Sequence, residues 1–411
     1  QIKHADYLNS RRIELKGEYQ DLRVSYLDGW PVINDANGNV HLKGAETSFS
    51  ILAGSMLGIQ DFSAELTLDN VNTYLSADVN FKSKGNGIIS FILNSPLKEE
   101  LSFLSNEWQS GGLVTGSMDL SFPVFNSVSS AIDLDIRFQL SDFDLFVPDY
   151  DLDFRSLEGE GGFYLPHHLS GDFQGKLFDE KISIKALSDR DNLKFALEGL
   201  ADTEMIKVIT EVSIEDYLEG SFEYFAEMVF ATNVTNRSKL SLETALEGMT
   251  VKLPLPFFKE QKERTEFKIN IDFADDKEFA YLSYADHDLL LTIKEREILN
   301  GAIALSGKTL PKDLPQNNGL VMGELEAINL AEYLDLIDVS ESSDVFWELK
   351  DLQFGQVNFK DIALEKVTAN GRLGGLASKV EIQSQLLDGV IEIEKVGNIN
   401  IDLDRLDLSV F

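Results

Sequence analysis

Three aspartates in the middle of the chain have a spacing that suggests metal chemistry. Asp149, Asp151 and Asp153 occupy the places of the first three ligands of a calcium-binding loop. Such a loop needs a glycine at its sixth position for its sharp turn, and this glycine is absent here. Arg155 also falls among the expected ligands. An acidic strand face in contact with water explains the same alternation. The sequence therefore favours a hydrated strand over a calcium site.

The other residues with catalytic or ligand chemistry do not form a recognisable constellation. His167 and His168 are adjacent, so on a strand they would point to opposite faces and could not bind one metal together. The glycines between 159 and 162 lack the spacing and the following helix of a phosphate-binding loop. Many carboxylates could pair as in a glycoside hydrolase, but nothing in the sequence selects two of them. We therefore expect no enzyme, no metal site and no cofactor.

The composition describes a folded, strongly acidic protein. The chain has 411 residues, of which 43% are hydrophobic, and its formal net charge is -34. This charge repels nucleic acid and adds nothing to binding at an anionic membrane surface, so we expect no nucleic-acid partner. The absence of cysteine excludes disulfides and thiolate metal sites. No run approaches the roughly 18 apolar residues that a membrane-spanning helix needs.

The stretch from Ala131 to Val147 shows the pattern that dominates the chain. Ile132, Leu134, Ile136 and Phe138 would project from one side of a strand, while charged and amide side chains alternate with them on the other. Between Leu140 and Phe143 the alternation slips by one residue, which predicts a β-bulge or a tight corner. A single ribbon of this kind cannot cover its own apolar face.

Similar alternation recurs along most of the chain and predicts on the order of 25 strands, more than the roughly ten that an open sheet tolerates before it curls or splits. Because nearly every strand has one apolar and one polar face, the pattern favours antiparallel pairing. Short helices are predicted at Pro96 to Leu104, Ser213 to Leu218 and Leu330 to Ile337, and a turn at Gly85 to Gly87. Two stacked sheets, a closed barrel and one long sheet bent into a trough all remain possible.

One stretch in the second half of the chain is more specific. Val251 to Lys259, with the sequence VKLPLPFFK, follows Leu246-Glu247-Gly248 and precedes the alternating strand Phe267 to Phe273. This arrangement resembles a stretch of the YhdP family, AsmA-like proteins of Gram-negative bacteria. Further segments agree with that family in their order along the chain: Gly29-Trp30-Pro31, Pro96-Leu97-Lys98, Gly116 to Pro123, Gly175 to Ile184 and Lys308 to Pro311. The resemblance spans nearly the whole chain.

The resemblance implies a mainly β fold: a long, twisted antiparallel sheet bent into a U-shaped groove with an apolar interior, with a few short helices. It also implies that the chain is a periplasmic piece of a longer protein whose missing N-terminal part is anchored in the inner membrane. Members of the family look like bridge-like lipid transfer proteins, along whose groove phospholipid acyl chains move between the inner and outer membranes. We expect residues 1-200 and 201-411 to form successive segments of this groove.

The strongest alternating strands supply the candidate lining of such a groove. The candidates are Ile132, Leu134, Ile136, Phe138, Phe267, Ile269, Ile271, Phe273, Ile399, Ile401 and Leu403. Each of them could equally belong to an ordinary core between sheets. Two other functions stay open: an elongated β scaffold of the cell envelope that carries no lipid, and a carbohydrate-active enzyme, for which Trp30, Trp108 and Trp347 offer little aromatic surface.

Overall fold

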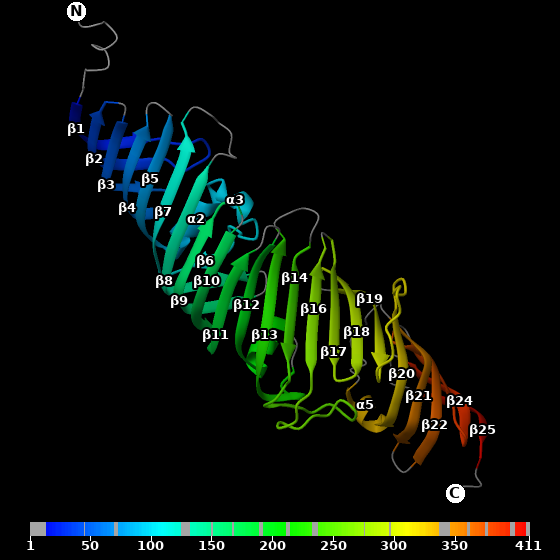
Figure 1. Ribbon diagram of the computed structural model, residues 1–411. Helices are drawn as coiled ribbons and strands as arrows, with labels where there is room; N and C mark the ends of the chain where they lie inside the picture. Colours follow the sequence, from blue (N-terminus) through cyan, green and yellow to red (C-terminus); the bar gives the residue numbers. More distant parts are fainter. Residues whose placement is uncertain are drawn as a thin grey trace, which may run out of the picture. The chain divides into compact units, whose positions relative to one another are not determined.

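The computed structural model describes most of the chain. The described residues are 14–44, 46–69, 73–124, 132–148, 151–166, 168–188, 192–210, 214–231, 237–274, 276–295, 297–336, 346–359, 362–374, 377–394 and 399–407. They contain 25 strands and four helices (Figure 1). The predicted mainly β fold with a few short helices is therefore confirmed.

The backbone divides into two compact units. Unit 1 comprises Gln1–Gly199 and Val229–Asn236, and unit 2 comprises Leu200–Met228 and Arg237–Phe411. Both units are built mainly of strands (Figure 1). That residues 1-200 and 201-411 act as successive segments of one groove stays a prediction.

Unit 1 is one antiparallel sheet in which pairing follows the chain almost without exception. The strands pair in the order β1, β2, β3, β4, β5, β7, β8, β9, β10, β11 and β12, and the short β6 pairs with β8. The bounds are β1 Glu14–Val24, β2 Ile33–Lys43, β3 Glu46–Met56, β4 Ile59–Asp69, β5 Tyr74–Lys84, β6 Gln109–Ser110, β7 Leu113–Pro123, β8 Asp133–Val147, β9 Leu152–Tyr164, β10 His168–Leu177, β11 Glu180–Ser188 and β12 Asn192–Asp202. This order is the one that short hairpin connections favour.

Strand β8 confirms the slip predicted from its sequence. Its pairing with β9 shifts register between Leu140 and Phe143, and Asp142 within the shift has a positive φ of 48°. Aspartate tolerates this left-handed conformation better than the branched residues do. Before the bulge the even-numbered residues of the strand are apolar, and after it the odd-numbered ones are. Because the bulge adds one residue, both sets can point to the same face while the sheet continues.

Unit 2 is also largely antiparallel, with two parallel pairs. Its main sheet pairs in the order β14, β16, β17, β18, β19, β20, β21, β22, β23, β24 and β25, and β13 pairs with β15. The bounds are β13 Leu218–Ala231, β14 Lys239–Thr244, β15 Met249–Val251, β16 Phe267–Phe273, β17 Glu278–Tyr284, β18 His287–Lys294, β19 Glu297–Leu305, β20 Gly319–Asn329, β21 Trp347–Phe359, β22 Ile362–Leu373, β23 Ala377–Gln383, β24 Leu387–Glu394 and β25 Ile399–Leu406.

The two parallel pairs, β19 with β20 and β20 with β21, are an exception to the antiparallel pattern predicted from alternation. A parallel pair needs a crossover connection of about a dozen residues or more. The chain supplies one in residues 306–318 and another in the segment that contains helix α5, Leu330–Leu336. Alternation of side chains is the same in both kinds of pair, so the sequence pattern could not distinguish them.

The helices follow the predictions in part. Helix α5 confirms the helix predicted from Leu330. Helix α3, Leu97–Glu100, lies inside the predicted Pro96 to Leu104 segment, and the Ser95 hydroxyl accepts a hydrogen bond from the Leu97 amide at 3.3 Å. The described part of the Ser213 to Leu218 segment forms a turn instead of a helix, and Ser213 lies outside the described residues.

Two helices were missed in the sequence. Helix α4 spans Thr203–Thr210, and helix α2 spans Gly85–Leu93, where the glycines predicted a turn. Gly85 and Gly87 form the first turn of α2 because their backbones lie against other backbone atoms, where a side chain would collide with Gly111 and Gly58. The prediction of a turn at Gly85 to Gly87 was therefore wrong.

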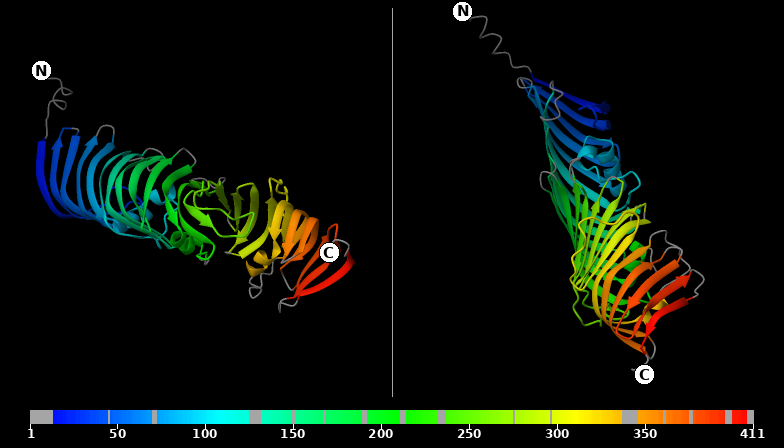
Figure 2. Two further views of the ribbon diagram at one scale, coloured as in Figure 1. Left: turned by 90° about the horizontal axis from the view of Figure 1, so that it is seen from below. Right: turned by 90° about the vertical axis from the view of Figure 1, so that its right-hand side faces the viewer.

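The sheets are curled and open at their outer edges (Figure 2). Among the described pairings, β1 pairs only with β2 and β25 only with β24, so neither unit closes into a barrel. The twist of adjacent strands accounts for the curl within each unit. The predicted open, curled sheet is confirmed for each unit, and a closed barrel is excluded for the described strands.

Candidate functional site

One face of the unit 2 sheet carries a row of apolar residues that follows the strand pairing from β14 to β25. Each member lies opposite the next one on the neighbouring strand, and directly opposed residues point to the same side of a sheet. The row consists of Leu242, Ile269, Leu282, Leu289, Ile303, Val321, Leu349, Gly371, Val380, Ile391 and Ile401. We call the side of the sheet that carries this row the apolar face of unit 2.

A second row runs beside the first, and its members lie two residues away from those of the first row on the same strands. Leu240 lies opposite Ile271, Ile271 opposite Ala280, and Ala280 opposite Leu291. The predicted residues Phe267, Ile269, Ile271 and Phe273 alternate along β16 and so share this face. The structure thus brings the β16 candidates together with Ile401 on one apolar surface.

The protein covers the apolar face of unit 2 only in part. All four β16 candidates are half-buried, as are the row members from Leu242 to Val321. Towards the end of the chain, Ile401 is 59% exposed and Leu403 is 42% exposed. The side chain of Ile399 lies outside the described ones. Leu349, in the middle of the row, is buried, and Gly371 opposite it has no side chain. Apolar surface therefore remains on both sides of this covered part, from Leu242 to Val321 and near Ile401.

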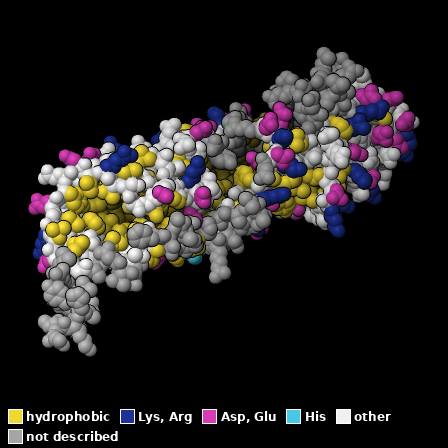
Figure 3. Space-filling model, turned by 90° about the horizontal axis from the view of Figure 1, so that it is seen from above, with side chains coloured by type: hydrophobic (Ala, Val, Ile, Leu, Met, Phe, Trp, Pro, Cys, Tyr) yellow, Lys and Arg dark blue, Asp and Glu magenta, His cyan; other side chains and the backbone are white. Residues whose placement is uncertain are grey.

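Unit 1 has an equivalent apolar face, on which the predicted β8 residues lie. One row crosses β2 to β8 as Val40, Phe49, Leu66, Ala77, Leu120 and Leu134. The next row contains Ile51, Ala64, Val79, Met118, Ile136, Phe163 and Leu169. Figure 3 shows apolar side chains gathered in a hollow of unit 1, with charged side chains around it.

The four predicted residues of the β8 segment differ in how much the protein covers them. Leu134 is fully buried, with 0% of its surface exposed, and Ile132 and Ile136 pack against the same core cluster. Phe138 is half-buried and its ring stacks on Phe173 with centroids 6.1 Å apart. In this conformation Leu134 is unavailable to a ligand, so its role as lining stays a prediction that requires the covering residues to move.

The connection between β5 and β7 contributes to the buried cluster that contains Leu134. Phe91 of α2, Leu97 of α3 and the following Leu101 belong to the same buried cluster as Leu134. Phe103, further along the connection, stacks on Phe230, which lies at the end of β13 and belongs to unit 1, with ring centroids 4.5 Å apart. The chain itself therefore partly fills the apolar face of unit 1, as it does in unit 2, where Phe257 and Val321 pack against a buried cluster that contains Leu349.

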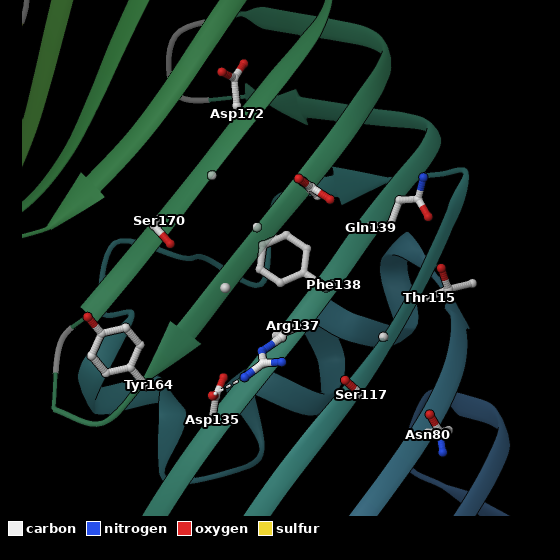
Figure 4. Close-up of a pocket in the computed structure, with 15 residues that line it drawn as sticks. Asn80, Thr115, Ser117, Asp135, Arg137, Phe138, Gln139, Tyr164, Ser170 and Asp172 are labelled. Atoms are coloured by element: carbon white, nitrogen blue, oxygen red, sulfur yellow. Dashed lines mark hydrogen bonds and ion pairs between the residues drawn. The ribbon is translucent and has the colours of Figure 1, made fainter.

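The polar face of unit 1 has different chemistry. It holds an open depression of about 860 Å³ over β7 to β10, lined by side chains such as Gln139, Ser170 and Asp172 (Figure 4). Asp135 and Arg137 also line the depression, and Asp135 accepts a hydrogen bond from Arg137 at 3.0 Å (Figure 4). Phe138 and Tyr164 also belong to the lining, but most of its side chains are polar or charged, which makes the depression a poorer candidate for a lipid site than the apolar faces.

Carboxylates face each other across four strands on this polar side. Glu65 lies opposite Asp78, Asp78 opposite Asp119, and Asp119 opposite Asp135. Partial burial, a hydrogen bond with Asp78 and the nearby negative charges raise the pKa of Asp119. Among the described residues, no group of three or more histidine or carboxylate side chains is arranged to hold a metal ion.

The VKLPLPFFK segment forms a fixed loop beside the apolar face of unit 2. Lys259 is buried, and its Nζ donates hydrogen bonds to the carbonyl oxygens of Met249 at 2.8 Å and Glu260 at 2.9 Å. Burial lowers the pKa of Lys259. The hydroxyl of Tyr284 donates to Phe257 O, and that of Tyr333 donates to Leu255 O, each at 2.9 Å. These contacts fix Phe257 against His287, with ring centroids 5.0 Å apart.

Comparison with known families decides the relationship suggested by this segment. The family model described as YhdP protein matches residues 5–410. The chain belongs to the YhdP family. Among curated proteins, none matches the sequence. The predicted membership in the YhdP family is thus confirmed, and the matched residues include those of both apolar faces.

No helix among the described residues is long and apolar enough to cross a membrane. The aspartates with calcium-loop spacing, for which the sequence favoured a hydrated strand, lie partly outside the described residues, since Asp149 is not among them. Asp153 accepts a hydrogen bond from Arg155 Nε at 2.9 Å.

Sequence reasoning missed several residues of the apolar face of unit 2. Leu282, Leu289 and Ile303 lie between the predicted β16 and β25 residues in the same row. The alternation of residues 289–293 indicated a strand, but its register against β16 depends on the connections between strands. Register, which the single sequence does not reveal, is what joins these residues into one surface.

Proposed function

We propose that this chain is a segment of a lipid transporter that carries phospholipid between the inner and outer membranes across the periplasm. The acyl chains lie on the apolar faces of the two sheets, and the headgroups remain at the polar rims. The inner-membrane anchor belongs to another part of the parent protein. Membership in the YhdP family and the open, curled sheets support this proposal.

The observation that carries the proposal is the half-exposed apolar row of unit 2. Burial of an acyl chain removes roughly 0.8 kcal/mol of unfavourable hydration per methylene. Ile269, Leu282 and Leu289 are neighbours of similar size and chemistry on consecutive strands. A chain that moves from one strand to the next therefore exchanges similar contacts, and no single position holds it in a deep energy minimum.

A comparison of charged variants on the two faces of β16 tests lipid binding. The purified chain should carry phospholipid that is detectable by native mass spectrometry. Ile269→Asp places a charge on the apolar face and should abolish most of this signal, because burial of an unpaired carboxylate is costly. Asn270→Asp changes the adjacent, exposed residue on the opposite face and should leave the signal unchanged.

The same experiment distinguishes a transporter from an envelope scaffold that carries no lipid. A scaffold predicts no bound phospholipid in the unmodified chain and equal behaviour of the two variants. Retention of lipid in the unmodified chain and in Asn270→Asp, with loss in Ile269→Asp, would exclude the scaffold.

A further inference from the structure

The segment Gly85–Trp108, which includes α2 and α3, leaves the sheet of unit 1 and returns to it at the same place. β5 and β7 are direct antiparallel partners, and the last residue of β5, Lys84, lies opposite the first residue of β7, Leu113. The Gly85 amide donates to Gly112 O at 3.3 Å and closes the base of the excursion. The sheet can therefore pair fully whatever position the excursion adopts.

Glycines lie at both ends of this segment. Gly85 and Gly87 begin α2, and Gly111 and Gly112 precede β7. Gly112 has a φ of 72°, a conformation that glycine adopts without strain. On the C-terminal side, the short strand β6 anchors the segment to β8. The segment is thus anchored through β6 at its C-terminal side, and it departs from the sheet and returns to it at glycines.

The segment covers the apolar face of unit 1 through apolar contacts. Phe91 and Leu97 are 6% and 3% exposed and belong to the buried cluster of this face, and Ile88 and Ile92 pack against the same cluster. Phe91 lies 6.1 Å from Trp30 between ring centroids, and both residues share a cluster with Leu134. These contacts occupy the surface that an acyl chain on the same row would need.

The covered state leaves a buried donor without a protein partner. Trp30 is 6% exposed, and its Nε1 has no hydrogen-bond acceptor among the described protein atoms. The hydroxyl of Ser110, at the anchored end of the segment, is also buried without a partner. A buried donor of this kind penalises the conformation that contains it.

We propose that Gly85–Trp108 is a displaceable lid on the apolar face of unit 1, and that an acyl chain displaces it. This inference rests on the proposed function, because the ligand is the same acyl chain. When the lid is closed, Leu134 and Phe163 are sealed and the face is blocked. When it lifts, the face becomes continuous from Val40 to Leu134, and the Trp30 indole N–H becomes available to an ester carbonyl of the lipid.

Hydrogen exchange of the unmodified chain tests the lid directly. Palmitoyl lysophosphatidylcholine, added below its critical micelle concentration, is the probe. The amides of α2 should exchange roughly tenfold faster with the probe than without it, which corresponds to a shift of about 1.4 kcal/mol. The amides of β5 and β7 should not change, since their pairing does not depend on the lid.

Two variants extend this test. Trp30→Phe removes the unpartnered donor and keeps an aromatic ring, so it should stabilise the closed lid, raise the melting temperature and reduce the probe-induced exchange of α2. Trp108→Phe changes an indole of the same segment whose Nε1 is not among the unpartnered atoms, and it should not raise the melting temperature. A lower melting temperature for Trp30→Phe would contradict the role given to its N–H.

The outcomes separate the lid from the proposed function. If the probe changes exchange on the unit 2 strands β16 to β18 but not in α2, the segment is a fixed part of the core and the lid is refuted, while lipid binding stands. If the probe binds to neither unit, the proposed function is contradicted, and the lid, which rests on it, is contradicted as well. Faster exchange in α2 with unchanged β5 and β7 supports both.

Discussion

Phe138 on β8 and Gly161 on β9 lie directly opposite each other, and the phenyl ring extends over the glycine. A Cβ atom added to Gly161 would lie 2.6 Å from Phe138 Cζ, so the ring occupies the space that a side chain would need. The same arrangement recurs one pair away, where a Cβ on Gly116 would lie 2.6 Å from Phe81 Cζ. Paired phenylalanine and glycine therefore give this part of the apolar face its surface of aromatic rings.

A side chain at Gly161 should disturb this arrangement. Gly161→Ala should destabilise unit 1 by about 1–3 kcal/mol, because the Phe138 ring must leave its position. Gly162→Ala is the matched control on the polar face, where an added Cβ has its nearest atom at 3.4 Å. Its effect should lie within about 0.5 kcal/mol. Urea unfolding of both variants measures the difference, and equal effects would contradict the contact.

Leu134 and Ile271 should respond differently to truncation, although both belong to alternating strands. Leu134 is fully buried, so Leu134→Ala should cost about 2–5 kcal/mol of stability. Ile271 is half-buried on the apolar face of unit 2. Ile271→Ala should cost less than about 2 kcal/mol, since little surrounding structure closes over it. Thermal unfolding checks this order, and a larger loss for Ile271→Ala would show that the face is sealed at this residue.

The carboxylate row on the polar face predicts a gain in stability on neutralisation. The raised pKa of Asp119 means that its ionised form opposes folding, so the penalty is present at neutral pH and disappears as pH falls through that pKa. Asp119→Asn should stabilise unit 1 at neutral pH by about 0.2–1 kcal/mol, with a smaller gain in acid. Asp61 lies opposite Lys82, so Asp61→Asn should give no gain. A loss of stability in Asp119→Asn at neutral pH would contradict this reasoning.

Half-buried tyrosines should make unit 2 sensitive to alkali. Burial raises the pKa of Tyr284 and of Tyr333 to about 12, whereas a tyrosine in the unfolded chain titrates near 10. The unfolded state loses these protons first, so stability should fall as pH rises from about 10 to about 12. Tyr284→Phe should lose about 0.5–1.5 kcal/mol at neutral pH with its hydrogen bond to Phe257 O, and should show a shallower alkaline decline.

Denaturant unfolding over this pH range provides the measurement for the tyrosine prediction. Tyr74→Phe, at an exposed tyrosine of unit 1, is the control. An alkaline decline that is as steep in Tyr284→Phe as in the unmodified chain would show that this tyrosine does not contribute.

The sequence was sufficient for the strands and insufficient for what covers them. The bulge of β8 between Leu140 and Phe143 was predictable because a change of parity in a strand has few structural causes. Leu134 and Ile269 show the same alternation, yet one is sealed and the other half-exposed. Cover depends on contacts between distant segments, which a periodicity of two does not encode.

Helix α2 also depends on contacts that the sequence pattern does not reveal. Its first turn consists of Gly85, Asn86 and Gly87, which are typical turn residues and poor helix formers. The helix forms because Ile88, Phe91 and Ile92 pack in the buried cluster of the apolar face and because the glycine backbone fits closely against neighbouring backbone. Tertiary packing thus overrides local propensity at this segment, and the single sequence gave no sign of it.

Photocrosslinking on the two faces of β16 tests the central claim most directly. A photoreactive amino acid is placed at Ile269, on the apolar face, or at Asn270, on the opposite face, and the protein is crosslinked in cells. We expect phospholipid adducts at position 269 and few or none at position 270. Equal labelling at both positions, or no lipid adduct at position 269, would contradict the claim that acyl chains lie on this face of the sheet.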